Sequence, residues 1–262
     1  MILTADYHTH TKYSHGKGTV LENALVAEER GLKELAISDH GFSHPAFGIT
    51  KRKVPAMRAD VDAVNESVRT KILLGIESNL LGENGAVDLK PQYYEWFDHF
   101  SVGFHKFILY NGIKDWFTFF GKNFTTQKFH KNPSDSLIKL NTKAYIAAIE
   151  KNPVDVITHV NFCVFADAVE VAKAARDNGT YLELNAKKSH LSDEELSEVV
   201  KTGVQFVIGS DAHSPGRVGE ISLVEDLLKR VSVPENQIAN INGKLPDFRF
   251  GKYKREHGIY RL

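Results

Sequence analysis

The chain has little cysteine and no excess of charge of either sign, and both absences limit the classes of protein to which it can belong. Cys163 is the only cysteine among 262 residues, which excludes a disulfide framework within the chain. The 33 basic residues balance 33 acidic ones, so no global field recruits nucleic acid or a membrane surface. No apolar run approaches the roughly 20 residues that span a bilayer, and the first residues do not resemble a signal peptide. We therefore expect a soluble, cytoplasmic protein with reduced thiols.

What the chain does have is a regular alternation of short apolar runs and helix-like segments. The expected strands cover residues 2–7, 35–38, 71–76, 100–104, 154–158, 181–184 and 205–209. Helices are expected at about 19–30, 51–69, 137–150, 166–178 and 221–231. Ser192 and Glu195 have the spacing of a capping box and would open one more helix. The alternation predicts a single α/β domain over residues 1–262, with a parallel sheet covered by helices.

The same alternation is compatible with an open, doubly wound sheet and with a closed barrel. Candidate metal-binding residues end six of the seven expected strands, all except the sixth. Only closure brings six strand ends to a common centre, and barrel active sites lie at that carboxyl-terminal face. We therefore predict a distorted seven-stranded (β/α)7 TIM-like barrel.

Residues 106–134 interrupt the alternation after the fourth strand by interleaving aromatic residues with lysines. We interpret them as a long βα loop, with room for a short helix, that rises from the active-site face. Its aromatic residues are too many for a bare exposed loop, namely Trp116, Phe117, Phe119, Phe120, Phe124 and Phe129. They would close the barrel mouth as a lid, pack on the protein itself or form a contact between subunits. We favour the last two, so a homo-oligomer built through this insert is a prediction.

Histidines and acids gather at the strand ends. Three pairs follow the first, second and seventh strands, namely His8 with His10, Asp39 with His40, and Asp211 with His213. Alternate residues of a strand project to one face, so His-x-His and Asp-x-His each direct two side chains at one place. Imidazole and carboxylate are the ligands that divalent transition metals prefer. The pattern predicts a metal centre and hydrolytic chemistry.

Each of these residues also has an ordinary interpretation. A lone His-x-His is usually a coincidence, and Asp211 could cap a helix. Asp39 could cap a turn, although we favour a role in orienting His40. Glu77, in contrast, would be a poor core residue after the apolar run L-L-G-I. It is the combination at strand ends that favours a metal site. The remaining histidines are expected to be solvated or structural, namely His99, His130, His190 and His257, whereas His44 could border the pocket.

The ordered motifs resemble the PHP (polymerase and histidinol phosphatase) family, and most of all its small stand-alone bacterial phosphatases. The motifs are H-T-H-T-K-Y-S-H-G, S-D-H-G, G-I-E-S-N, G-F-H, I-T-H-V, L-E-L-N and G-S-D-A-H-S, and they extend to about Glu220. The resemblance implies a trinuclear site for zinc, manganese or iron. It implies His8, His10, Glu77 and Asp211 as ligands of one ion, Glu77, His105 and His159 of a second, and His15, His40 and His213 of a third. Two features depart from the family pattern: His159 is followed by Val160-Asn161 instead of Pro-Gly, and the insert is long.

The charges of such a site favour an anionic substrate. Nine ligands supply only two formal negative charges, from Glu77 and Asp211, against six positive charges on three divalent ions. We therefore expect a phosphomonoesterase acting on a small metabolite, such as a histidinol phosphate-like compound or a sugar or nucleotide phosphate. A hydroxide bridging two ions would attack phosphorus, activated by the ligands His10, Glu77 and Asp211. Substrate contacts are expected from Asn185, Lys187 and Arg217.

Three other functions remain open from the residues alone. The lysines and aromatic residues of the insert would suit a phosphodiesterase or exonuclease on nucleic acid, but the neutral charge opposes it. A non-catalytic metal-bearing accessory module would not need the full set of nine ligands. A mononuclear amidohydrolase-type barrel would leave the third histidine cluster without a role.

Overall fold

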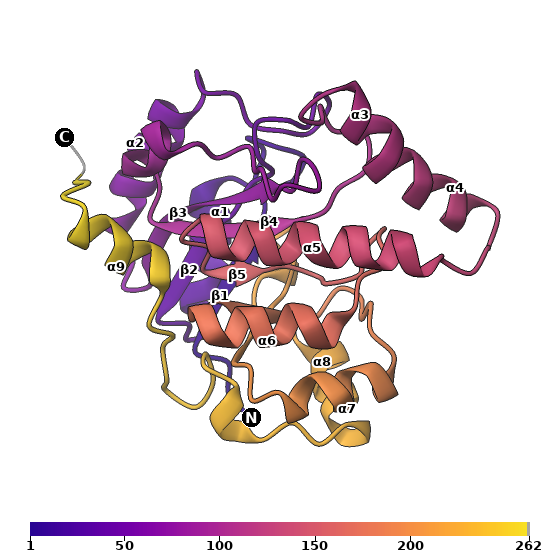
Figure 1. The fold of residues 1–262 in the computed structure, drawn as a ribbon. Helices are drawn as coiled ribbons and strands as arrows, with labels where there is room; N and C mark the ends of the chain where they lie inside the picture. The colour runs from indigo at the N-terminus through magenta and orange to yellow at the C-terminus, as the bar shows by residue number, and fades with distance from the viewer. Residues whose placement is uncertain (261–262) are drawn as a thin grey trace.

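A computed structural model describes residues 1–260, which form a sheet of seven parallel strands surrounded by helices (Figure 1). The strands are β1 (Ala5–Thr9), β2 (Glu34–Ile37), β3 (Lys71–Asn79), β4 (His99–Gly103), β5 (Val156–Ile157), β6 (Tyr181–Asn185) and β7 (Phe206–Gly209). The α-helices are α1 (Val20–Glu29), α2 (Val54–Asn65), α3 (Ile113–Asp115), α4 (Lys122–Lys128), α5 (Asp135–Lys151), α6 (Ala168–Asn178), α7 (Asp193–Lys201), α8 (Ser222–Arg230) and α9 (Arg249–Glu256). Short 3-10 helices cover Pro91–Trp96, Pro215–Arg217 and Glu235–Gln237.

The strands pair in the order β1 to β7, and contacts between β1 and β7 nearly close the sheet. Just beyond these two strands, the backbone N–H of His10 donates to the carbonyl of Ala212 at 2.8 Å. Asn240 spans the opposite end of the junction. Its buried amide donates to the carbonyls of Ala5 and Ile208, both at 2.8 Å, and accepts from the Ile208 N–H at 2.9 Å. The predicted (β/α)7 barrel is confirmed.

Capping residues visible in the sequence set several helix ends. Ser192 accepts from the backbone N–H of Glu195 at 3.1 Å, while the Glu195 carboxylate accepts from the Ser192 N–H at 2.8 Å, so the predicted capping box is confirmed. Thr19 and Glu22 form a second box at the start of α1. Helix α6 ends at Gly179, whose φ of +69° costs glycine no steric energy.

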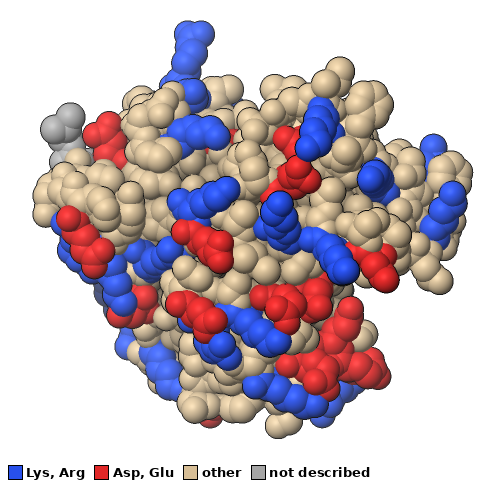
Figure 2. Space-filling model, in the orientation of Figure 1, with Lys and Arg blue, Asp and Glu red and all other residues tan. Residues whose placement is uncertain are grey.

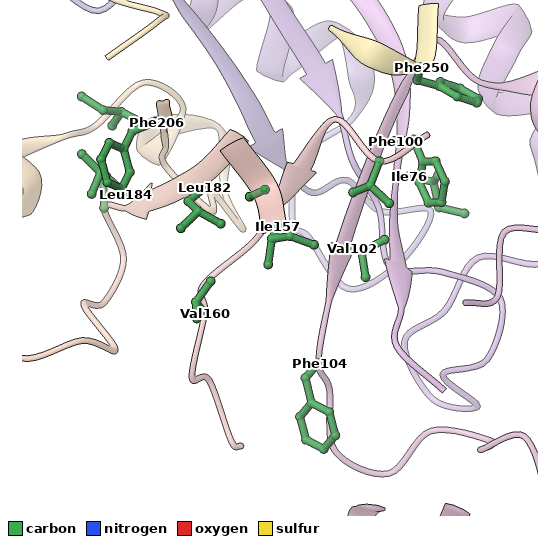
Figure 3. Close-up of a cluster of buried hydrophobic side chains, with 14 of the residues drawn as sticks. Ile76, Phe100, Val102, Phe104, Ile157, Val160, Leu182, Leu184, Phe206 and Phe250 are labelled. Carbon is green, nitrogen blue, oxygen red and sulfur yellow. The ribbon is translucent and has the colours of Figure 1, made fainter. Parts of the chain in front are cut away.

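Strand alternation separates the apolar core from the polar side chains. Ile72, Leu74 and Ile76 of β3 join the large apolar cluster, which places Glu77 and Asn79 on the opposite face of the same strand. Figure 3 shows part of that cluster, in which Ile76 and Phe100 lie near Phe250 of α9, and Val102 and further apolar side chains follow toward β5, β6 and β7. Three strands end later than predicted: β1 reaches Thr9, β3 reaches Asn79 and β6 reaches Asn185. His8 and Glu77 therefore lie inside strands.

The insert connects β4 to α5, as predicted, but its helical run is longer than the short helix for which the sequence left room. Helix α3, a π-helical stretch (Trp116–Gly121) and α4 follow one another without a break (Figure 1). Phe119 is fully buried and packs edge-on against Phe104, with ring centroids 5.2 Å apart. Asn123 of α4 and Asn141 of α5 exchange two hydrogen bonds of 2.9 Å. Aromatic residues on several sides of the segment hid its helical spacing in the sequence.

The surface agrees with the balanced composition. Figure 2 shows basic and acidic side chains interspersed over most of the face in view. Among residues 1–260, no helix is long and apolar enough to pass through a bilayer. Phe119 and Phe120 of the insert are buried against the protein itself, whereas Trp116, Phe117 and Phe129 remain exposed. The homo-oligomer predicted through this insert stays a prediction.

Candidate metal centre

The nine predicted ligands lie together at one end of the barrel. Histidine rings from different strands and loops form a continuous group. Ring centroids of His10 and His15 each lie 4.3 Å from His213, and those of His15 and His40 lie 4.7 Å apart. His40 is 4.6 Å from His105, and His105 is 5.3 Å from His159 (ring centroids). The barrel therefore brings together residues as far apart in the sequence as His8 and His213.

Glu77 occupies the middle of this group. Its Oε1 lies 2.7 Å from Nε2 of His159 and 3.4 Å from Nε2 of His8. Its Oε2 lies 2.9 Å from Nδ1 of His40 and 3.3 Å from Nε2 of His105. One carboxylate thus faces imidazoles on both sides, as a ligand shared between ions would.

Four sets of three potential ligand atoms lie within 4.8 Å of one another. They are His8, His10 and Asp211; His8, Glu77 and His159; His40, Glu77 and His105; and His10, His40 and His213. The first set falls within the first ion's implied ligands. In the other sets, His8, His10 or His40 joins residues that the family pattern assigns to another ion, so the division into three sites stays a prediction.

Several buried polar atoms in the cluster lack a hydrogen bond of normal geometry within the protein. They are Nε2 of His8, both ring nitrogens of His10, Nδ1 of His15, His40 and His159, and Oε2 of Glu77. Buried polar groups are nearly always paired in proteins. Imidazole nitrogens and carboxylate oxygens without thiolates suit zinc, manganese or iron. The donor set therefore fits divalent metal ions.

The electrostatics prepare most of these groups for coordination. Burial lowers the pKa of His10 to about 3, lowers that of His15 to about 4, and holds that of His40 well below its usual range. Burial alone would raise the pKa of Glu77 and of Asp211, but the surrounding histidines outweigh it and hold both values well below the usual range. Neutral imidazoles and ionised carboxylates are the forms that bind metal ions.

Glu183 of β6 belongs to the centre and was missed in the sequence. Its Oε1 lies 2.6 Å from Nδ1 of His8, and its Oε2 accepts from the backbone N–H of His159 at 2.8 Å. This contact orients His8 so that Nε2 faces Glu77. The available signal was an acid in L-E-L-N, inside a buried strand and two residues before Asn185 on the same face.

Two other acids hold the ligands in place. Asp88 accepts from the Asn79 amide at 2.6 Å, and Asn79 Oδ1 lies 2.9 Å from Nδ1 of His105, which directs Nε2 of that ring at Glu77. Asp39, expected to orient His40, accepts from the backbone N–H of Thr11 at 2.7 Å and from the Ser14 hydroxyl. Asp39 therefore fixes the loop that carries His15.

Two glycines make room for these contacts. A Cβ on Gly209 would lie 2.2 Å from Oε1 of Glu183 and 3.0 Å from Cβ of His8. A Cβ on Gly103 would lie 2.8 Å from the ring of His159 and 3.0 Å from Oε1 of Glu77. Only glycine allows the strands to carry polar side chains this close to the centre.

A cavity of about 410 Å³ opens above the cluster and contains Lys187 but not Asn185 or Arg217. Lys187 Nζ lies 3.3 Å from Oδ1 of Asp211 and 3.2 Å from Nδ1 of His213. The Asn185 side chain accepts from the backbone N–H groups of Lys187 and Lys188, so it shapes the loop that presents them. Arg217 is exposed outside the cavity.

Two histidines that were not among the predicted site residues also line the cavity. His44 lines it, as the sequence left open. His190, expected to be solvated or structural, lines it as well, from the loop between β6 and α7. His99 is fully buried away from the cavity and contacts Ser101 at 2.9 Å, which is the structural role expected for it.

Known proteins resemble this chain in sequence and in fold. A family model described as "PHP domain" matches residues 6–187. A protein named "Probable phosphatase" from Caldanaerobacter subterraneus is 28% identical over 98% of this chain and 94% of its own length. Another of the same name from Shewanella sediminis is 30% identical over 90% and 88% of the two chains. The histidinol phosphate phosphatase of Lactococcus lactis, solved with zinc, L-histidinol and phosphate, superimposes with a TM-score of 0.58 at 15% identity, covering 94% of this chain and 100% of that one.

Proposed function

The chain belongs to the PHP domain family and is a metal-dependent phosphatase, and we propose that it hydrolyses a small phosphomonoester at ions held by the nine clustered ligands. The observation that carries this proposal is the group of buried nitrogen and oxygen atoms at the cavity that lack hydrogen bonds of normal geometry within the protein. Such atoms are costly to bury without partners. Cations that bind them would in turn need an anion, which a phosphate group supplies.

Some residues of the cluster would bind the metal ions, and others would orient these ligands. His8, His10, His15, His40, Glu77, His105, His159, Asp211 and His213 would hold the ions. Divalent ions bound there would polarise phosphoryl oxygens and lower the pKa of water. Glu183 and Asn79 keep His8 and His105 turned toward Glu77, so the ligand atoms are arranged before substrate arrives.

Lys187 is the side chain best placed to bind the phosphate directly. Its ammonium offers three donors and reaches the edge of the cluster at Asp211 and His213. A phosphate oxygen entering the cavity would accept a hydrogen bond from this ammonium, which would hold the phosphate against the cluster. Asn185 would act through Lys187, because its carbonyl fixes the start of this loop.

A phosphate-release screen over small phosphomonoesters tests the proposal, with metal content measured by elemental analysis. His10→Ala and Asp211→Ala should abolish phosphate release while leaving the circular dichroism spectrum near that of the natural protein. His257→Ala and Asp226→Ala are matched controls, since both residues are exposed and neither lines the cavity. Full activity in either cluster variant would refute the proposed site.

A further inference from the structure

The helical insert after β4 has apolar side chains on its exposed side as well as on its buried side. Phe119 and Phe120 are buried against the rest of the protein. Ile113, Trp116 and Phe117 of the same run are 78%, 45% and 60% exposed. A helix that is apolar on all sides is normally buried on all sides. The outer side of the insert therefore lacks the apolar surroundings that its sequence favours.

The exposed apolar side chains of the protein concentrate on this insert. Six of the thirteen large ones in residues 1–260 belong to it and are called the insert patch, namely Phe107, Leu109, Ile113, Trp116, Phe117 and Phe129. The ring centroid of Trp116 lies 4.8 Å from that of Phe117 and 5.8 Å from that of Phe120, which in turn lies 5.5 Å from Phe107. The rings thus form a connected surface from Phe117 to Phe107. Exposed apolar clusters of this kind mark contacts with another molecule or with a membrane.

Positive charge accompanies this patch although the chain as a whole is neutral. Residues 106–134 contain five lysines and one acidic residue, Asp115, so their net charge is +4. Lys114 pairs with Glu83 at 2.9 Å. Three other lysines form no ion pair within residues 1–260, namely Lys122, Lys128 and Lys131. Figure 2 shows basic side chains among uncharged ones at the end of the molecule where α4 lies in Figure 1.

Two of the unpaired lysines lie beside aromatic rings. Nζ of Lys128 is 5.8 Å from the ring centroids of both Phe124 and Phe129, and Nζ of Lys131 is 5.6 Å from that of Phe129. A lysine can bury its carbon chain along apolar surface while its ammonium group stays in a polar layer. Lysines beside exposed aromatic and aliphatic residues are typical of helices that lie in the interface of a bilayer.

We propose that the insert patch docks on the surface of an anionic lipid bilayer. Ile113, Trp116 and Phe117 would enter the headgroup region, while the unpaired lysines would contact lipid phosphates. The proposal goes beyond the proposed function and does not depend on it. Phe107 belongs to the patch and also lines the cavity, so docking would hold the mouth of the cavity beside the lipid surface.

Two other occupants fit the patch less well. A second copy of the chain, related by a two-fold axis, would place the patch against itself, so the unpaired lysines of both copies would meet. Single-stranded nucleic acid would stack its bases on rings. The most exposed residues of the patch are instead Ile113 and Leu109, at 78% and 66%, and neither carries a ring. A bilayer accommodates aliphatic and aromatic side chains alike.

Sedimentation of the full chain with vesicles tests the proposal, using phosphatidylcholine vesicles with and without about one third phosphatidylserine. The protein should bind the anionic vesicles at least tenfold more strongly than the neutral ones, because the lysines contribute to binding only on the anionic surface. The bound fraction should fall as the salt concentration rises. Absence of binding to the anionic vesicles would overturn the proposal.

Two variants separate the apolar and the basic contributions. Ile113→Ser should weaken binding to anionic vesicles about tenfold, because a large apolar side chain no longer enters the interface. Lys128→Gln should weaken it about fivefold, as expected for the loss of one basic residue near an anionic surface. Both side chains are exposed, so neither change should disturb the fold.

Leu245→Ser and Lys244→Gln are the matched controls. Leu245 is 43% exposed, and Lys244 is exposed without an ion pair in the part of the chain that the structure describes. Both follow Gly243, whose N–H donates to Thr4 just before β1, at the end of the barrel opposite the cavity. The controls should leave vesicle binding within twofold. If the two insert variants bind as well as the controls, the proposal fails.

Two further measurements identify the other occupants. Light scattering that shows a dimer, dissociated by Ile113→Ser, in a protein that ignores vesicles would overturn the proposal in favour of a subunit contact. Salt-dependent binding of oligothymidylate without vesicle binding would overturn it in favour of nucleic acid. Phosphate release enters none of these measurements, so loss of the proposed function would leave the docking proposal standing.

Discussion

Glu183 offers the sharpest test of how the ligands are held in place. Glu183→Gln keeps the size of the side chain but replaces one accepting oxygen with a donating NH2 group. The carboxylate now serves Nδ1 of His8 on one oxygen and the backbone N–H of His159 on the other. Glutamine has only one accepting oxygen, and the two contacts lie on different oxygens of Glu183, so one of them must lose its acceptor.

The size of the effect can be estimated for each of the two orientations of the glutamine amide. If the amide oxygen stays with His159, the NH2 group faces Nδ1 of His8, and the ring must carry its proton on Nε2, the atom that faces Glu77. Loss of an orienting carboxylate typically lowers metal affinity or activity 10- to 100-fold, or about 1.4–2.7 kcal/mol. If the amide turns over, the His159 N–H loses its acceptor, which costs about 1–3 kcal/mol of stability.

The assay is a metal titration against a competing chelator, with urea unfolding measured on the same samples. Glu183→Gln should bind metal at least tenfold more weakly, and excess metal should restore part of the phosphatase activity. Glu198→Gln is the control, since Glu198 is exposed on α7 and pairs only with Lys201 among the contacts in residues 1–260. Unchanged metal affinity together with unchanged stability would refute the role given to Glu183.

Three further predictions follow from the same contacts. Asn240→Ala leaves three buried backbone groups between β1 and β7 without a hydrogen-bond partner, so it should lower the free energy of unfolding by about 3–5 kcal/mol. Asn178→Ala is the control, and equal urea midpoints for the two variants would contradict this prediction. Lys187→Met should raise KM about tenfold with a smaller effect on kcat, whereas Lys173→Met on α6 should change neither. Chelation should abolish activity and lower Tm, since metal ions bind only the folded cluster, and added zinc or manganese should restore both.

The ligand types and their place at strand ends made most of the centre predictable. Apart from His15, which only the family resemblance implied, the nine residues lie at the ends of apolar runs, and a closed barrel leaves those ends one place to meet. The family resemblance supplied the bridging role of Glu77, and the structure puts that carboxylate between His159 and His40.

What the sequence could not reveal depends on contacts between distant strands. Glu183 reaches His8 only because Gly209 of β7 has no side chain, and neither neighbour is near it in the sequence. His190 looked like any solvated histidine until the loop after β6 placed it over the cavity. The helices of the insert were obscured because aromatic residues occupy several of its faces. Of these aromatic residues, only Phe119 and Phe120 are buried.

The most direct test of the account is anomalous scattering from crystals of the metal-saturated protein, recorded at the zinc or manganese edge. We predict peaks among His8, His10, Glu77, His40 and Asp211, within coordination distance of those side chains. A map with no peak between these residues, from protein fully supplied with both metals, would contradict the claim that they form a metal centre.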